Sequence, residues 1–313
     1  MCCLYRFSII IAGVLLAFVD AGSGAGPFPA GQNLITDPDF ANGFVVESPA
    51  VDPHAGGQKR IEGTKVTPWT TGDAVWHLAQ WNSRESVAPN AENVSPDLVA
   101  WRNQAKTIAI GRPGSSDEGL ETIVNANFEF NSRYNAAQVK KGWPHLLLRQ
   151  TFNDTPVHAV PLASLTQLPF SAQYRLTVAR PVPKAGVGHY LIFFLVQGIN
   201  SHETAHLGLG LYDNRYPVIK RWTGADHDKH RLIYQLGFED GYLQGDPRSG
   251  QWVDIKLDLL PKIQEMLGYG TRNGTLSSAD IRDYNLIAIT LNWEVPGLGV
   301  FGSKIRHLRL EAK

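Results

Sequence analysis

Short segments in which apolar and polar positions alternate dominate the chain after residue 106. Such alternation is typical of β-strands, because side chains two residues apart point to the same face. Each segment ends at Gly, Pro, Asn or Asp, which favour turns. The segments predicted as strands are Thr107–Ile110, Glu121–Phe130, His145–Phe152, Tyr174–Ala179, Tyr190–Val196, His206–Tyr212, Arg231–Leu236, Ile287–Val295 and Lys304–Leu310.

One segment has a helical period instead. Leu259, Leu260, Ile263 and Leu267 lie at the spacing of one helix face, and Gly268 is the expected end of the helix. Regular strands with a single short helix favour two packed antiparallel sheets over a parallel α/β sheet. The sequence therefore predicts an all-β protein, an antiparallel β-sandwich of the jelly-roll type.

The region from Val45 to Asn103 follows neither period clearly, and it contains Trp69, Trp76, Trp81 and Trp101. We interpret it as long, ordered loops that cover one sheet. No internal repeat divides the chain, and large β-sandwiches commonly form one domain. We therefore expect a single jelly-roll domain over residues 26–313, with a Trp-rich loop region near residues 45–103.

Residues 1–25 have the pattern of a signal peptide. Arg6 supplies positive charge, Ser8–Val19 is an apolar run, and small residues follow it. The run is too short to span a bilayer, and no comparable run follows. Cys2 and Cys3 are the only cysteines, so a processed chain contains no disulfide and no catalytic thiol. We expect a secreted or periplasmic protein without a membrane span.

The charged residues are balanced, with 29 Lys and Arg against 29 Asp and Glu and a formal net charge of zero. A chain without an excess of basic residues has no positive field to hold a phosphate backbone. We therefore expect no nucleic-acid partner.

The two ends of the predicted domain resemble carbohydrate-binding modules of families 4 and 9. The segment Asn33-Leu-Ile-Thr-Asp-Pro-Asp-Phe-Ala-Asn-Gly43 is similar to the opening strand of those modules, and Ile305–Ala312 has the shape of their last strand. The resemblance implies a jelly roll in which the first and last strands pair. It also implies a polysaccharide or oligosaccharide as the partner.

The C-terminal part resembles family 12 glycoside hydrolases. A helix, a loop and then Tyr284-Asn-Leu-Ile-Ala-Ile-Thr-Leu-Asn-Trp-Glu-Val-Pro-Gly297 are similar to the end of that family, in which a late strand carries the acid/base glutamate. Glu294 stands at the matching position. The family's nucleophile belongs to an earlier strand, where this sequence has Leu191 in Tyr190-Leu-Ile-Phe-Phe-Leu195. The resemblance therefore implies a concanavalin-like fold more than an activity.

Polar side chains gather on shared faces of three predicted strands. Hydroxyl-rich ligands need short polar groups that donate and accept in fixed directions, whereas an ordinary solvated sheet face has the same alternation. Trp76 and Trp81 are candidate stacking platforms, although tryptophan belongs as often to a core. The candidate carbohydrate-binding residues are Asn125, Asn127, His145, Arg149, Asn292, Trp76 and Trp81.

Glu129 and Glu294 are the candidate catalytic carboxylates. Retaining glycosidases hold two carboxyl groups roughly 5 Å apart and inverting ones roughly 6.5–9.5 Å apart, and one group must stay protonated. Alternatively, each glutamate pairs with an arginine such as Arg149. A polysaccharide lyase instead needs a base and a neutralising cation, which His145 and Arg149 can supply.

The segment His202-Glu203-Thr204-Ala205-His206 matches the H-E-x-x-H pattern of zinc metallopeptidases. On a helix the two histidines bind one zinc ion and the glutamate activates water. The strand-like segments on both sides, together with Gly208 and Gly210, disfavour that helix. Because the motif is complete but its context is unlike a helix, a zinc metallopeptidase is an alternative and not the main prediction.

Asp37 and Asp39 near the opening strand are candidate metal ligands. Calcium takes six to eight oxygen ligands, so two aspartates alone do not define a site. We expect that the protein requires no cofactor, with calcium as an option.

Taken together, these patterns predict a protein that recognises a polysaccharide. They leave open whether it also cleaves that polysaccharide as a glycoside hydrolase with Glu294 as acid/base, or as a lyase. A structural protein of the cell envelope without a small ligand is a further alternative.

Overall fold

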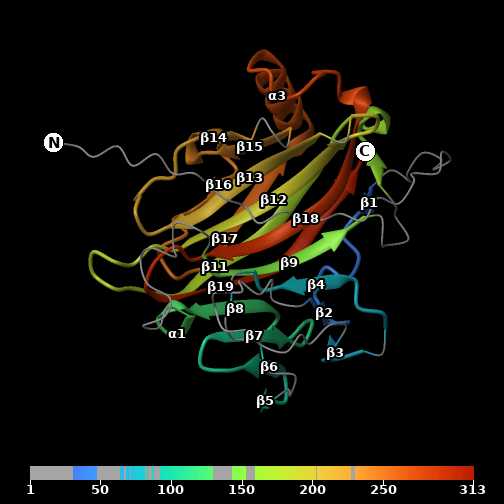
Figure 1. Ribbon diagram of the computed structural model, residues 1–313. Helices are drawn as coiled ribbons and strands as arrows, with labels where there is room; N and C mark the ends of the chain where they lie inside the picture. The colour runs from blue at the N-terminus through green and yellow to red at the C-terminus, as the bar shows by residue number, and fades with distance from the viewer. Residues whose placement is uncertain are drawn as a thin grey trace.

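The computed structural model describes residues 31–47, 64–66, 68–70, 72–81, 83, 87, 92–129, 143–152, 159–201, 203–226 and 230–313. Within these residues, a ten-stranded and a nine-stranded sheet pack face to face (Figure 1). We call the ten-stranded sheet the front sheet and the nine-stranded sheet the rear sheet. The predicted β-sandwich is therefore confirmed.

The front sheet contains, from edge to edge, β14 (Trp222–Asp226), β15 (Arg231–Leu236), β13 (Thr204–Asp213), β12 (His189–Gly198), β18 (Tyr284–Glu294), β9 (His145–Thr151), β4 (Trp76–Ala79), β2 (Phe44–Val46) and β3 (Thr64–Val66), with β10 (Val160–Pro161) beside β18. The rear sheet contains β16 (Leu243–Gln244), β17 (Val253–Asp258), β11 (Pro169–Pro181), β19 (Gly299–Ala312), β8 (Gly119–Asn125), β7 (Lys106–Gly111), β6 (Leu98–Arg102) and β5 (Glu92–Ser95), with β1 (Gln32–Asn33) beside β19.

The chain crosses repeatedly between the two sheets. From β8 in the rear sheet it passes to β9 in the front sheet, then to β11 in the rear and β12 in the front, and it ends with β17, β18 and β19 in the same alternation. Such crossing connections are those of double-sheet jelly rolls. The pairs β13–β15 and β2–β4 are parallel, and the other described pairs are antiparallel.

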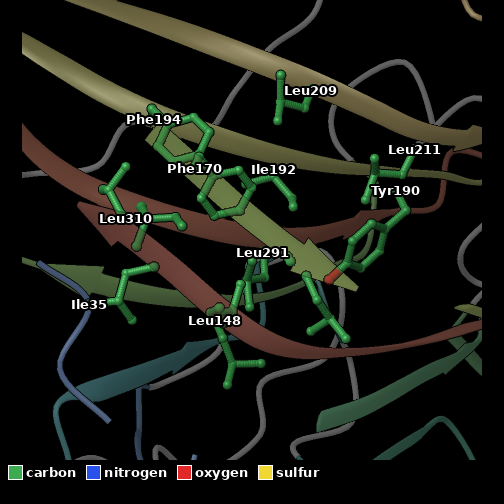
Figure 2. Close-up of a cluster of buried hydrophobic side chains, with 14 of the residues drawn as sticks. Ile35, Leu148, Phe170, Tyr190, Ile192, Phe194, Leu209, Leu211, Leu291 and Leu310 are labelled. Carbon is green, nitrogen blue, oxygen red and sulfur yellow. The ribbon is translucent and has the colours of Figure 1, made fainter. Parts of the chain in front are cut away.

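The core lies between the sheets, where every second side chain of each central strand points inward. Phe170 of β11 meets Phe194 of β12 with ring centroids 4.9 Å apart, and Trp293 of β18 meets Phe301 of β19 at 5.9 Å. Figure 2 shows Phe170 and Phe194 among the aliphatic side chains of this layer. Because Trp293 faces the core, its neighbour Glu294 faces the opposite side of the front sheet.

The first and last described strands pair, as predicted for a jelly roll. Gln32 lies opposite Ala312 and Asn33 opposite Glu311 in an antiparallel pair. The Asn33 side chain also accepts a hydrogen bond from the backbone of Leu310, at 2.9 Å, which fixes the register at this edge.

Helix α3 (Leu259–Arg272) is longer than the prediction, which ended it at Gly268. Asp258 begins the helix, since its side chain accepts a hydrogen bond from the backbone of Leu260. A Cβ on Gly270 would lie 2.6 Å from Leu276, so glycine here permits close packing rather than ending the helix.

Two other segments differ from the sequence-based expectation. Strand β8 ends at Asn125, and a one-turn helix, α1 (Ala126–Glu129), follows, so Asn127 and Glu129 do not continue the strand face of Asn125. The region near residues 45–103 contributes strands to both sheets, including β4 and β6, and is not built of loops alone. The single-domain prediction and the signal peptide, which lies outside the described residues, stay predictions.

Candidate functional site

A row of polar residues crosses the front sheet on the face turned away from the core. His145 of β9 lies opposite Glu294 of β18, Glu294 lies opposite His189 of β12, and His189 lies opposite Asp213 of β13. Directly opposed residues on neighbouring strands bring their side chains close together. The register of four strands therefore assembles one cluster from residues far apart in the sequence.

Glu294 is buried and receives hydrogen bonds on both carboxylate oxygens. Its Oε2 accepts from the indole of Trp143 at 3.2 Å and from His189 Nε2 at 3.0 Å, and its Oε1 accepts from Asn292 Nδ2 at 2.8 Å. Burial alone would raise the pKa of this carboxyl, but the neighbouring imidazoles and the hydrogen bonds from His189 and Trp143 lower it to about 2. Glu294 is therefore a carboxylate at neutral pH.

A chain of hydrogen bonds through Arg215 orients His189. Arg215 donates from Nη2 to His189 Nδ1 at 3.4 Å, and because a guanidinium only donates, that ring nitrogen is the acceptor. The proton of a neutral His189 then lies on Nε2, where it is directed at Glu294. Arg215 is itself held by Asp213 through Nε to Oδ1 at 2.9 Å and Nη2 to Oδ2 at 2.6 Å.

His145 is buried without a hydrogen bond on either ring nitrogen to any described residue. Its Nδ1 lies 4.0 Å from Glu294 Oε1, and its ring lies between Trp143, stacked at 6.0 Å, and Trp81, at 5.8 Å. Burial lowers the pKa of His145, against the opposing effect of the Glu294 charge. The site therefore presents a neutral imidazole beside a carboxylate.

A cavity of about 340 Å³, which we call the main cavity, opens over this row. Its walls combine aromatic rings with charged side chains, a composition typical of small-molecule sites. The aromatic and charged residues that line it are Trp143, His189, Phe193, Tyr212, Asp213, Arg215, Tyr216, Lys220, Arg221, Trp222 and Glu294.

Strand β13 makes room for this cavity with glycine. The segment Leu207-Gly-Leu-Gly-Leu211 buries its three leucines completely in the core and turns Gly208 and Gly210 to the outer face. A Cβ on Gly208 would lie 2.7 Å from the ring of Phe193, and one on Gly210 would lie 2.9 Å from Ile219. The glycines therefore allow both side chains to lie over the strand.

A second, smaller cavity of about 40 Å³ adjoins the main cavity along the front sheet. The two share Phe193 and Glu294 in their linings. We call it the small cavity, and it is lined by Trp81, His145, Leu147, Arg149, Phe193, Leu195, His206, Thr290, Asn292 and Glu294.

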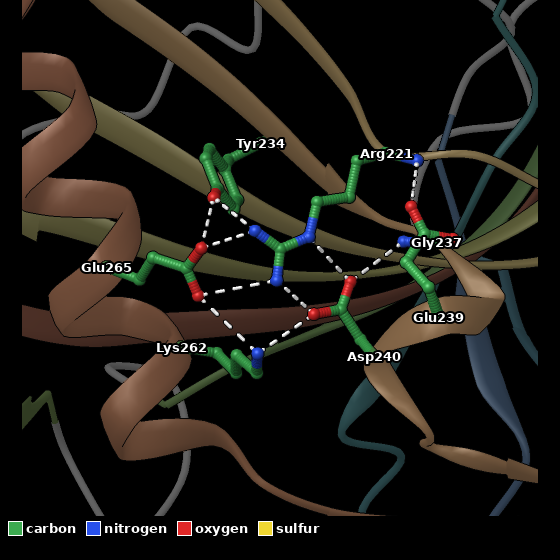
Figure 3. A network of polar contacts seen from close by, with 7 residues as sticks. All are labelled: Arg221, Tyr234, Gly237, Glu239, Asp240, Lys262 and Glu265. Carbon is green, nitrogen blue, oxygen red and sulfur yellow. Dashed lines mark hydrogen bonds and ion pairs between the residues drawn. The ribbon is translucent and has the colours of Figure 1, made fainter.

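An ion-pair network fixes one wall of the main cavity. Arg221 precedes β14 and pairs with Asp240 and with Glu265 of α3, while Tyr234 of β15 donates to Glu265 at 2.8 Å (Figure 3). Lys262 of α3 closes the network on Asp240 at 2.8 Å. The helix thereby holds the segment that carries Arg221 and its neighbour Trp222 against the edge of the sheet.

Several predicted site residues meet in the small cavity. His145, Arg149, Asn292 and Glu294 line it together with Trp81. The charge of Arg149 is offset by Glu47, to which its Nη2 donates at 2.6 Å.

The other predicted carboxylate, Glu129, does not line either cavity. It lies in α1, where it is completely buried, forms an ion pair with Lys106 and accepts a hydrogen bond from Ser83 at 2.5 Å. The prediction paired Glu129 with Glu294 because it assumed a continuous strand, which the turn into α1 removes. Glu129 instead forms a structural ion pair, with Lys106 and not with an arginine as the alternative expected.

Three predicted binding residues also lie outside the cavities. Asn125 ends β8 in the rear sheet and donates to the backbone oxygen of Gln104 at 3.0 Å, and Asn127 is exposed in α1. Trp76 is completely buried against Phe40 at 5.0 Å, so neither ring face can stack on a ligand.

The candidate metal sites find no support in the described part of the chain, which contains no group of three or more His, Cys, Asp or Glu side chains able to hold a metal ion. Asp37 binds the backbone N–H groups of Ala41 and Asn42 at 2.8 and 3.0 Å, and so it closes a turn. Burial raises the pKa of Asp37 to about 6 and also raises that of Asp39.

The zinc metallopeptidase geometry is wrong for this chain. His202 lies outside the described residues, but Thr204–Asp213 is strand β13 and not a helix. Glu203 accepts hydrogen bonds from the backbone N–H and the hydroxyl of Ser277 at 3.0 and 2.9 Å. It therefore stabilises the loop at Ser277 and is not placed to activate water. His206 faces the small cavity, and burial lowers its pKa to about 4.

Sequence reasoning missed His189, Asp213, Arg215 and Trp222. His189 stands two residues before Leu191, on the same strand face, and this spacing is a signal that can be read from the sequence. Asp213 and Arg215 follow the predicted strand His206–Tyr212, and nothing in the sequence shows that this segment lies beside Glu294.

No protein-family model and no curated protein matches the sequence. Solved structures with a similar fold include a family 12 xyloglucanase from Bacillus licheniformis, with 9% identity, a TM-score of 0.40 and coverage of 73% of this chain and 99% of that chain. Endoglucanase 3 from Trichoderma harzianum, of family 12, has 8% identity, a TM-score of 0.37 and coverage of 77% and 100%. A thermostable cellulase derived from one of Rhodothermus marinus has 12% identity, a TM-score of 0.37 and coverage of 72% and 96%. At TM-scores this low, the likeness assigns neither activity nor substrate to this chain.

Among the residues that the structure describes, no helix combines the length and the apolar character needed to cross a lipid bilayer.

Proposed function

We propose that this protein binds a polysaccharide or oligosaccharide along the outer face of the front sheet. The observation that carries the proposal is the composition of the main cavity, where aromatic rings stand beside convergent polar groups. Tyr216 and Trp222 line the cavity and remain 51% and 38% exposed, so part of each ring is accessible to a ligand. Rings of this kind bury the C–H faces of a sugar, while His189, Asp213 and Glu294 can bond its hydroxyls.

Hydrolysis by two carboxylates has less support than binding. A glycosidase acid must be protonated to assist the leaving group, but Glu294 has a pKa of about 2 and three donors. The position diagonal to it on β12 is Leu191, and the other carboxylate in the main cavity, Asp213, is held by Arg215. The described residues therefore supply one ionised carboxylate and no free partner.

A lyase mechanism has a similar difficulty. It needs a cation to neutralise the sugar carboxylate, and the predicted cation, Arg149, is already paired with Glu47 at 2.6 Å. The predicted base, His145, is neutral as the mechanism requires, but it stands beside the negative Glu294.

The binding proposal is tested by affinity measurements against a panel of soluble polysaccharides, with wild type, Trp222→Ala and Trp252→Ala. Trp252 lies on the rear sheet, between the guanidinium groups of Arg175 and Arg306, and is the matched control. We expect at least one glycan to bind, Trp222→Ala to weaken it about tenfold or more, and Trp252→Ala to leave it unchanged. Binding to no glycan, or equal losses in both variants, would overturn the proposal.

The same panel distinguishes binding from cleavage. We expect no release of reducing ends and no rise in absorbance near 235 nm, the mark of an unsaturated lyase product. Product that wild type forms and Glu294→Gln does not form would replace binding by catalysis at Glu294.

We also propose that the protein is exported, on the basis of the signal-peptide pattern in residues 1–25. N-terminal sequencing of the protein recovered from the periplasm or medium tests this. A start near residue 26 is the expected result, and an intact start at Met1 in the cytoplasm would contradict it.

A further inference from the structure

We propose that the small cavity is a specificity pocket that receives one uncharged, hydroxyl-bearing arm of the bound sugar, such as a hydroxymethyl group, and excludes a carboxylate at the same place. This inference rests on the proposed glycan binding in the main cavity. The pocket would allow the protein to discriminate between sugars that share one backbone.

Unpaired polar atoms mark the small cavity as a binding site. Neither ring nitrogen of His145 has a hydrogen-bond partner among the described residues, and neither has the Oδ1 of Asn292. The two residues are 1% and 2% exposed. Buried polar groups are nearly always bonded, because an unpaired one costs about 1–3 kcal/mol. Two unpaired groups in one cavity lining therefore indicate a missing polar partner.

The size of the cavity limits what that partner can be. About 40 Å³ suffices for a water molecule or a single hydroxymethyl group, but not for a sugar ring. Leu147, Phe193 and Leu195 form apolar walls around the polar end. A methylene group that carries one hydroxyl matches this division between apolar walls and polar end.

The charges around the cavity favour an uncharged group that donates a hydrogen bond. Asn292 donates from Nδ2 to Glu294 at 2.8 Å, and its Oδ1, which accepts, has no partner among the described residues. Burial lowers the pKa of His145 and of His206, so both imidazoles offer a lone pair. The cation of this lining, Arg149, pairs through Nη2 with Glu47, and its Nε is a third buried group without a partner among the described residues. Each neutral imidazole offers one lone pair and one N–H, which suits a hydroxyl, a group that both donates and accepts. A carboxylate on the ligand would lie beside the negative Glu294, and the repulsion between the two charges disfavours it.

The two cavities are neighbours on the outer face of the front sheet. Both are lined by Phe193 and Glu294, so a sugar ring in the main cavity lies next to the entrance of the small one. The ring would stack on the aromatic wall, and its arm would reach His145 and Asn292.

Matched polymers that share a backbone and differ in one substituent test this pocket. The probes are β-1,4-glucan, xylan and polyglucuronate oligosaccharides, which have hydroxymethyl, hydrogen and carboxylate at the same ring position, and mannan with polymannuronate as a second pair. For whichever backbone binds, we expect the hydroxymethyl form to bind wild type at least tenfold more tightly than the others. Equal or tighter binding of the uronate or pentose form would overturn the proposal that the small cavity is a specificity pocket.

Three variants distinguish the contribution of the small cavity to binding from that of the main cavity. His145→Phe removes both ring nitrogens and Leu147→Phe narrows the cavity, so either change is expected to abolish the preference while binding to the backbone remains. Trp222→Ala is expected to weaken all forms and keep their order. Because Leu147→Phe leaves the polar groups in place, it tests the pocket even where His145→Phe does not fold.

The outcomes distinguish this inference from the proposed function. A preference that survives both His145→Phe and Leu147→Phe would overturn the pocket and leave glycan binding intact. Binding of none of the polymers by wild type would overturn glycan binding and the pocket with it.

Discussion

Replacing Glu294 by glutamine tests the electrostatic organisation of the site. The buried carboxyl has its pKa lowered from an ordinary value of 4.5 to about 2 by its imidazole neighbours and hydrogen-bond donors, against the cost of burial. At about 1.4 kcal/mol for each tenfold change in proton affinity, this difference corresponds to roughly 3 kcal/mol of folding free energy.

The lowered pKa of Glu294 determines how the stability of the protein changes with pH. A carboxyl whose pKa is lowered in the folded protein contributes stability above its unfolded pKa, near 4.5, and loses that contribution as the pH falls toward 2. In Glu294→Gln an amide NH₂ replaces one acceptor oxygen, so one of the donors Trp143, His189 and Asn292 loses its partner. An unpaired buried donor costs about 1–3 kcal/mol at neutral pH.

Urea unfolding at a series of pH values between 7 and 2 measures both effects. We expect the free-energy difference between wild type and Glu294→Gln to be largest above pH 5 and to shrink by roughly 3 kcal/mol by pH 2. Asp254→Asn, on β17 of the rear sheet, controls for the loss of one carboxylate elsewhere. A difference that stays constant with pH would refute the assignment of an ionised, donor-held Glu294.

Three further predictions concern the elements around the site. Lys106→Met leaves the buried Glu129 without its ion pair, so we expect a loss of about 3–5 kcal/mol in urea unfolding, largely recovered by adding Glu129→Met; equal stability of wild type and Lys106→Met would contradict this. Gly208→Val forces a side chain against Phe193, so we expect a loss of about 1–3 kcal/mol, and an unchanged thermal midpoint would speak against the packing of β13. Arg221→Ala removes the ion pair between Glu265 of α3 and the segment that precedes β14, so the amides of α3 are expected to exchange faster while the rear sheet keeps its protection; unchanged exchange in α3 would show that this ion pair does not hold the helix.

The strands were predictable because each central strand has one face in the core and follows a period of two. Strand β15 has the predicted bounds, Arg231–Leu236, and the bounds of β12 and β18 differ from the predicted ones by only a few residues. The prediction failed where a local pattern continued but the chain turned. Alternation runs from Glu121 through Glu129, yet the strand ends at Asn125 and the glutamate turns into a buried ion pair with Lys106.

The site was predictable only in part, because no single segment of the sequence specifies which residues lie opposite each other on neighbouring strands. The sequence identified His145, Asn292 and Glu294 as side chains on polar faces, and these do meet. It did not show that His189 and Asp213 complete the row, since β12 joins β18 through a pairing of residues 105 apart in sequence, and β13 joins the row only through β12. It also could not show that Trp76 is buried in the core while Trp143 donates to Glu294.

The central claim is that a glycan occupies the main cavity on the front sheet. A crystal structure of the protein with an oligosaccharide of the tightest-binding glycan of the panel tests it most directly. The account predicts a sugar ring against Trp222 and Tyr216, with a hydroxyl bonded to the row of His189 and Glu294. A sugar bound on the rear sheet or elsewhere, with the main cavity empty, would contradict it.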